Sequence, residues 1–174
     1  MYALTQFFEA IRDFIEQGGD VLLIIAFVIA AMWMIMTERF IYFNGEHKRL
    51  VKKTLDTWNS RTDRTSWNAK RIREAMISRV EGGARQSLAL VKALVTMCPL
   101  LGLLGTVTGM IEVFDVMAVS GTGNARSMAS GVAKAILPTM AGMVGALSGV
   151  FASTYLGTKA KQEIELLADN MSDE

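Results

Sequence analysis

Two threonines, Thr106 and Thr139, are the polar residues of greatest chemical interest, because each lies in a long stretch without charged residues. Thr106 lies six residues before Glu112, and Thr139 lies five residues after Lys134. On helices that rise ~1.5 Å per residue, the two hydroxyls lie at similar depths, about 9 and 7.5 Å from the charged ends. Each hydroxyl could simply bond a carbonyl of its own helix. Alternatively, the two could line a pathway or receive a polar group from another chain.

Two oppositely charged residues, Glu112 and Lys134, flank the same stretches and are expected at the outer ends of two antiparallel helices. An ion pair between them would reduce the cost of placing a charge near the membrane, and it could gate the outer mouth of a pore. In the alternative interpretation, both side chains reach water independently, because a lysine side chain can extend to the interface.

Three stretches free of charged residues give the chain its architecture. They are residues 21–37, 93–111 and 135–158, with lengths of 17, 19 and 24 residues. A helix needs about 20 apolar residues to cross the hydrocarbon core, so we predict an all-α membrane protein with three transmembrane helices. With flanking residues included, the predicted spans are residues 20–38, 93–111 and 135–158.

The distribution of charge predicts the orientation of these spans. Residues 39–92 contain 13 Lys and Arg against 5 Asp and Glu, a net charge of +8, whereas residues 1–20 carry a net charge of −3. Basic residues near the ends of spans remain in the cytoplasm. We therefore predict an outer N-terminus, a cytoplasmic segment 39–92, a short outer (periplasmic) loop 112–134, and a cytoplasmic C-terminal helix 159–174.

The segments outside the spans are also expected to be helical. Residues 1–19 carry apolar residues at helical spacing and predict an amphipathic helix on the outer membrane surface, or alternatively a helix that docks a partner. Gly18 and Gly19 would form the corner into the first span. Apolar residues of segment 159–174 recur at helical spacing (Ile164, Leu167, Ala168 and Met171), which predicts packing on neighbouring helices.

The cytoplasmic segment 39–92 is interpreted as a helical hairpin with a break near residues 59–66. Gly82 and Gly83 form a weak point in its second helix. Its basic residues are either a solvated face or a surface that binds anionic phospholipids of the cytoplasmic leaflet.

Small residues recur on the second and third spans. A Gly at every fourth position lets another helix backbone approach closely. The residues assigned to helix packing are Gly102, Gly105, Gly109, Gly142, Gly145 and Gly149.

Several functional classes are disfavoured. His47 is the only histidine, so a catalytic triad or a His-based metal site is not expected. The chain has no P-loop and no water-soluble segment large enough for an enzyme core. We therefore expect no enzyme activity, no catalytic residue, no cofactor, no metal and no nucleic-acid partner.

Two motifs of the chain resemble those of ExbB and TolQ, which belong to the MotA/TolQ/ExbB proton channel family. Residues 102–110 (GLLGTVTGM) are similar to the family signature GLFGTVWGI, and residues 131–143 (GVAKAILPTMAGM) are similar to GIAEALLATAIGL. The predicted topology resembles the family's along almost the whole chain.

The resemblance implies a function in the bacterial inner membrane. Family members form a homo-oligomeric ring, usually of five copies, around the transmembrane helices of a small ExbD- or TolR-like partner with a single span. The partner's intramembrane Asp carries the proton, and threonines at the positions of Thr106 and Thr139 line the pore near it. The proton motive force then energises a TonB- or TolA-like protein for transport at the outer membrane.

The sequence departs from the family pattern at several positions. Lys134 replaces the usual Glu, Glu112 replaces a neutral polar residue, and Pro138 replaces a small residue, which is expected to kink the third span. These differences favour a divergent ExbB. The alternatives are a TolQ- or MotA-like stator subunit, although MotA-like proteins have four spans, or a membrane scaffold without energy coupling.

Overall fold

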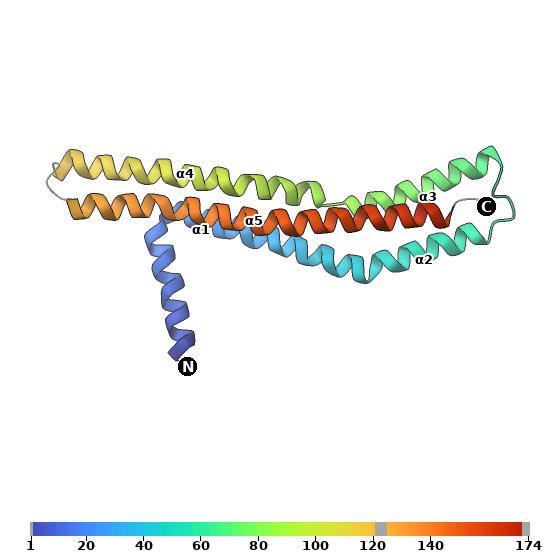
Figure 1. Ribbon diagram of the computed structural model, residues 1–174, viewed down its shortest axis with the longest axis horizontal. Coiled ribbons are helices and arrows are strands. Elements are labelled where there is room, and N and C mark those ends of the chain that lie inside the picture. Colours follow the sequence, from blue (N-terminus) through green and yellow to red (C-terminus); the bar gives the residue numbers. More distant parts are fainter. Residues whose placement is uncertain (1, 121–124, 172–174) are drawn as a thin grey trace. The chain divides into compact units, whose positions relative to one another are not determined.

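The structure, a computed structural model, describes residues 2–120 and 125–171, and the whole of this part is built from α-helices and the turns between them (Figure 1). The helices are α1 (Tyr2–Asn44), α2 (Glu46–Asn59), α3 (Trp67–Arg85), α4 (Leu88–Ser120) and α5 (Ala125–Asn170).

Three helical segments are long and apolar enough to cross a membrane, judged by length and composition. They are Gly18–Asn59, Trp67–Val119 and Met128–Asn170, and each contains one of the three predicted charge-free stretches. The all-α class with three potential spans is therefore confirmed.

Helix α1 bends at Gly19, where the backbone leaves helical geometry with φ 67° and ψ −168° (Figure 1). Only glycine adopts such a conformation without steric cost, so the predicted corner before the first span is confirmed. Of the apolar side chains before this corner, Phe14 is exposed, whereas those of Phe7, Phe8 and Ile11 lie outside the described residues.

The chain divides into two compact units. The first unit combines Met1–Met32 with Ala93–Val150, and the second combines Trp33–Lys92 with Phe151–Glu174. In the first unit, α1, α4 and α5 each contribute buried residues, and large apolar side chains also remain exposed on all three helices. Such exposed apolar surface suits contact with lipid or with other membrane helices. The buried residues include Leu22, Ile25, Val95, Cys98, Val113 and Ala135, and the exposed ones include Phe27, Leu100 and Val144.

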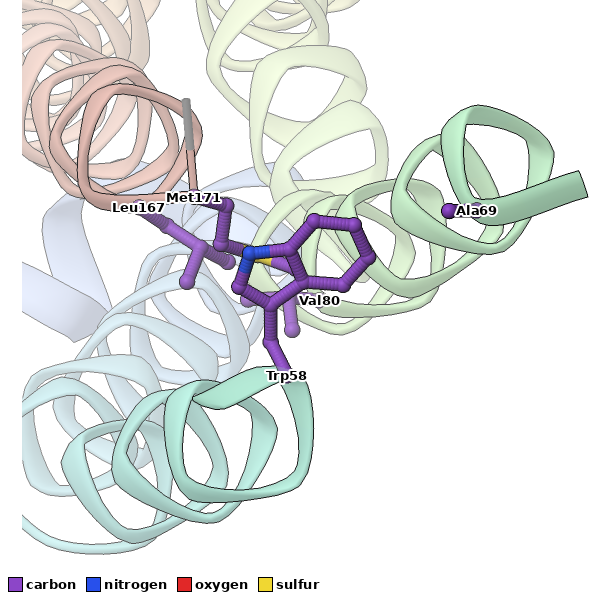
Figure 2. Packing of buried hydrophobic residues seen from close by; sticks show 5 residues of the cluster. All are labelled: Trp58, Ala69, Val80, Leu167 and Met171. Carbon is purple, nitrogen blue, oxygen red and sulfur yellow. The ribbon is translucent and has the colours of Figure 1, made fainter. Parts of the chain in front are cut away.

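The core of the second unit forms where α2, α3 and the end of α5 meet. Figure 2 shows the Trp58 indole beside Met171 and Val80, with Leu167 close by. Leu167 and Met171 belong to the apolar face that the sequence places on segment 159–174, and both are almost fully buried. Arg73 of α3 adds a polar link, because its Nη2 donates a hydrogen bond of 2.7 Å to the carbonyl oxygen of Ala168.

The turn between α2 and α3 lies in the region where the sequence indicates a break. Ser66 is the N-cap of α3, and its Oγ accepts a hydrogen bond from the backbone N–H of Ala69. Asp63 in turn accepts hydrogen bonds from the side chain and the backbone of Ser66, which lower the pKa of its carboxyl. A chain of local side-chain bonds thus begins the second helix.

The prediction of a weak point at Gly82 and Gly83 was wrong. Helix α3 continues through both glycines to Arg85, and the break lies at Ser87, whose φ is 65°. Gly83 is explained by packing: a methyl group there would lie 2.9 Å from the Tyr42 hydroxyl, and its carbonyl accepts a 3.2 Å hydrogen bond from Arg39 Nη1. The glycine therefore serves a close contact between α3 and α1 rather than a bend.

His47, the only histidine, is fully buried at the start of α2. Its ring lies against those of Phe43 and Tyr42, with centroid separations of 5.2 and 5.9 Å. Neither ring nitrogen has a hydrogen-bond partner within the described residues, and burial lowers the pKa of the imidazole. The ring is thus a neutral core residue of the second unit.

Candidate functional site

The hydroxyls of Thr106 and Thr139 lie together in the first unit, where α4 packs against α5. Thr139 Oγ1 donates a 2.9 Å hydrogen bond across the helix pair to the carbonyl oxygen of Gly102. Thr106 Oγ1 lies 3.3 Å from the same oxygen, one turn back on its own helix, and the two threonine hydroxyls contact each other directly. We call these two hydroxyls and the Gly102 carbonyl the hydroxyl cluster.

The number of hydrogens in this cluster defines its chemistry. Each threonine hydroxyl has one hydrogen and two acceptor lone pairs, and a carbonyl only accepts. One hydroxyl hydrogen bonds the Gly102 oxygen and the other bonds the neighbouring hydroxyl, so both hydrogens are used inside the cluster. Lone pairs remain on the oxygens. The cluster can therefore accept a hydrogen bond from an incoming O–H group more readily than it can donate one.

Close approach of the two helix backbones brings this cluster together. A methyl group at Gly102 would lie 2.9 Å from Thr139 Cα and 3.1 Å from the Pro138 carbonyl oxygen, and one at Gly109 would lie 2.7 Å from Ala135 Cα. The distances to the two Cα atoms are shorter than real side chains allow. Glycine at these two positions therefore permits the cross-helix hydrogen bond of Thr139.

The other glycines assigned to packing face different neighbours within the first unit. Gly105 and Gly142 lie between α4 and α5, Gly145 faces α1, and Gly149 faces both α1 and α4. A side chain at Gly105 would meet Pro138, one at Gly142 the Cys98 carbonyl, one at Gly145 the side chain of Ile29, and one at Gly149 those of Met32 and Val95.

Glu112 and Lys134 form an ion pair in the same unit. Lys134 Nζ donates to Glu112 Oε2 over 2.9 Å, with the two side chains 39% and 62% exposed. A methyl group at Gly19 would lie 3.6 Å from Lys134 Cε, so the lysine stem passes beside the bend of α1. The two residues thus pair, as one interpretation of the sequence had it, and both also keep contact with solvent.

Sequence reasoning missed two contributors to the site. The depth of the threonines could be counted along each helix, but the Gly102 carbonyl as a shared acceptor depends on how the helices rotate about their axes. Pro138 was identified as a departure from a motif and as an expected kink in the third span, but its packing was not foreseen: it lies inside α5, fully buried against Gly105.

Metal ligands do not gather in the described part of the chain, where no three His, Cys, Asp or Glu residues lie close enough to hold an ion.

Comparison with known proteins gives a family match over residues 43–169, to the MotA/TolQ/ExbB proton channel family. Two similar relatives from Synechocystis sp. are named as biopolymer transport proteins ExbB-like 1 and ExbB-like 3. The first is 34% identical over 87 residues (48% of this chain, 34% of the relative), and the second is 36% identical over 74 residues (38% and 35%). The chain thus spans about a third of the length of the curated relatives it matches.

The family match covers well over half of the chain. It extends from the end of α1 to the end of α5 and contains the hydroxyl cluster as well as the ion pair. The chain therefore belongs to the MotA/TolQ/ExbB proton channel family.

Proposed function

We propose that the chain is an ExbB-type subunit of an inner-membrane complex driven by the proton motive force. Five copies form a ring around an ExbD-like partner with a single span, and the complex energises a TonB-like protein for transport across the outer membrane. The family match supports the wider class of proton channel proteins, and the names of the two ExbB-like relatives favour an ExbB-type function over a TolQ- or MotA-like one.

The observation that supports this proposal most directly is the hydroxyl cluster. A protonated carboxyl group on the partner can donate its O–H to a lone pair of Thr106 or Thr139. A deprotonated carboxylate needs a donor instead, and it obtains one only if a threonine hydroxyl gives up its hydrogen bond to Gly102 or to the other threonine. The cluster therefore favours the neutral, proton-carrying form of the acid at the depth where a charge is costly.

The division of labour between the two chains follows from the charge pattern. Segments 93–111 and 135–158 contain no Asp, Glu, Lys, Arg or His, so they provide polar contacts without a group that carries a proton. The carboxyl must come from another chain, and several copies are needed to enclose a pathway, because three helices cannot line one. The proposal is tested by measuring proton flux into vesicles. Flux is expected only when this chain and its ExbD-like partner are both present.

The proposed orientation places α2, α3 and the end of α5 in the cytoplasm. In a Cys98→Ser background, single cysteines at Gln6 and Ala118 are expected to react with a membrane-impermeant thiol reagent in intact cells, whereas one at Ser60 is not. All three positions are exposed. Strong labelling at Ser60 in unbroken cells would reverse the assignment.

We further propose that the Glu112–Lys134 pair gates the outer mouth of the pathway. The pair is partly exposed, so its contribution to stability is expected to be small, ~0–1 kcal/mol. Glu112→Lys and Lys134→Glu each place like charges 2.9 Å apart in the native geometry and should slow proton flux and lower the thermal midpoint of the purified complex.

The charge-swapped double variant is the informative control. It restores opposite charges and is expected to recover most of the flux lost in each single variant. Simple addition of the two defects would mean that the residues act independently.

A further inference from the structure

A basic groove lies in the second unit, between the end of α3, the first turn of α4 and the middle of α5. It encloses about 550 Å³. Its polar lining combines three cationic side chains with three hydroxyls. These are Arg85, Lys92 and Lys161, together with Ser153, Thr154 and Thr158.

The charge of this lining is positive. Arg85 and Lys161 each have a carboxylate one turn away on their own helix, with N–O distances of 3.0 Å to Glu81 and 3.7 Å to Glu165. All four of these side chains are exposed, so the pairs are weak and the cations can turn towards a ligand in the groove. The two carboxylates are not among the residues that line the groove.

The groove lies at the boundary between apolar and charged sequence. Lys92 immediately precedes the charge-free segment 93–111, and Ser153 to Thr158 are the last six residues of segment 135–158. Lys161 follows three residues later, so the polar groups span about 12 Å along α5. This is the depth of lipid headgroups, where basic side chains attract anionic phosphates.

An apolar surface continues from the groove towards the membrane. Phe151 is 75% exposed and lies one turn before Thr154 on α5, and Tyr155 is 55% exposed beside it. Such side chains can contact acyl chains while the cations hold the phosphate. A soluble phosphate compound has no acyl chain to contact this apolar surface. The combination of cationic side chains with an adjacent apolar surface therefore favours a lipid.

We propose that this groove binds the phosphate headgroup of an anionic phospholipid. Arg85, Lys92 and Lys161 hold the phosphate, Thr154 and Thr158 donate hydrogen bonds to its oxygens, and the acyl chains extend along Phe151. In the orientation proposed above, the lipid belongs to the cytoplasmic leaflet.

The test measures lipid binding by native mass spectrometry. Phosphatidylglycerol or phosphatidylcholine is added to the delipidated, detergent-solubilised full chain. Phosphatidylglycerol should bind at least tenfold more tightly than phosphatidylcholine. Lys92→Gln and Lys161→Gln should each weaken its binding about fivefold, and the triple variant with Arg85→Gln correspondingly more.

The matched control is the variant Arg49→Gln, Lys52→Gln, Lys53→Gln. It removes three positive charges, as the triple variant does, but from another basic patch, on α2. This variant should bind phosphatidylglycerol as the unmodified chain does. The single variants serve if the triple variant does not fold.

Any of four results would overturn the proposal. The first is equal binding of both lipids, and the second is an equal loss in the control variant. The third is displacement of phosphatidylglycerol by inorganic phosphate in excess, which would indicate a site for a soluble anion. If the triple variant changes the number of chains in the complex but still binds phosphatidylglycerol normally, the groove is a contact between subunits. This result also contradicts a lipid site.

Discussion

Replacing both Thr106 and Thr139 by valine is expected to slow proton flux through the reconstituted complex by roughly threefold to thirtyfold. Hydrogen bonds inside membranes are worth ~0.6–2 kcal/mol each, and the double variant removes the two hydroxyls that can accept a hydrogen bond from the partner's acid. Valine keeps the shape of threonine, so the helices should still pack and assemble. Flux is measured as acidification of vesicles that contain a pH-sensitive dye, at equal amounts of assembled complex.

Thr108→Val is the matched control for this experiment. Thr108 lies on the same helix, but within the described residues its hydroxyl bonds the carbonyls of Leu104 and Gly105 in its own turn, both at 3.1 Å. Its loss should leave flux close to that of the unmodified complex. Full flux in the Thr106 and Thr139 double variant would show that the cluster only serves helix packing.

Gly102→Ala is expected to destabilise the chain by ~1–3 kcal/mol, the usual cost of inserting a methyl group into a closely packed contact. The new methyl would meet Thr139 Cα and the Pro138 carbonyl oxygen, which are backbone atoms that cannot rotate away. Helices α4 and α5 must then separate, which also lengthens the bond from Thr139 to Gly102. Both the thermal midpoint of the purified chain and its proton flux with the partner should fall.

The corresponding control is Gly82→Ala on α3, where a methyl group has no neighbour within 4 Å. Alanine is the better helix former by about 0.5–1 kcal/mol, so this variant should be as stable as the unmodified chain or slightly more stable. If the two glycine variants have the same thermal midpoint, the close approach of α4 and α5 at Gly102 is not a feature of the folded protein.

The class of fold could be predicted from the sequence because charge and helix length act locally. A charge-free stretch of about 20 residues has few other interpretations, and the glycine pair before the first span offered a backbone geometry that other residues avoid. The break near residues 59–66 was predicted, and α2 ends at Asn59. The break at Ser87 was not visible, because a serine with a positive φ carries no signal comparable to that of Gly82 and Gly83.

The candidate site could be predicted in part. Counting residues along a helix gives depth, since the rise is uniform, and the sequence therefore placed Thr106 and Thr139 at one level. Rotation about the helix axis depends on packing between helices, so the shared Gly102 carbonyl and the burial of Pro138 needed the structure. The pairing of Glu112 with Lys134 was one of two alternatives for the same reason, because a long lysine side chain can reach either a partner or water.

The central claim is that this chain lines the pathway while another chain carries the proton. It is tested most directly by proton flux into vesicles that contain the purified chain alone, the chain with an ExbD-like single-span partner, or the chain with a partner whose intramembrane Asp is replaced by Asn. Flux driven by a membrane potential is expected only with the chain and the unmodified partner together. Equal flux through vesicles that contain the chain alone, or the Asn variant of the partner, would contradict the account.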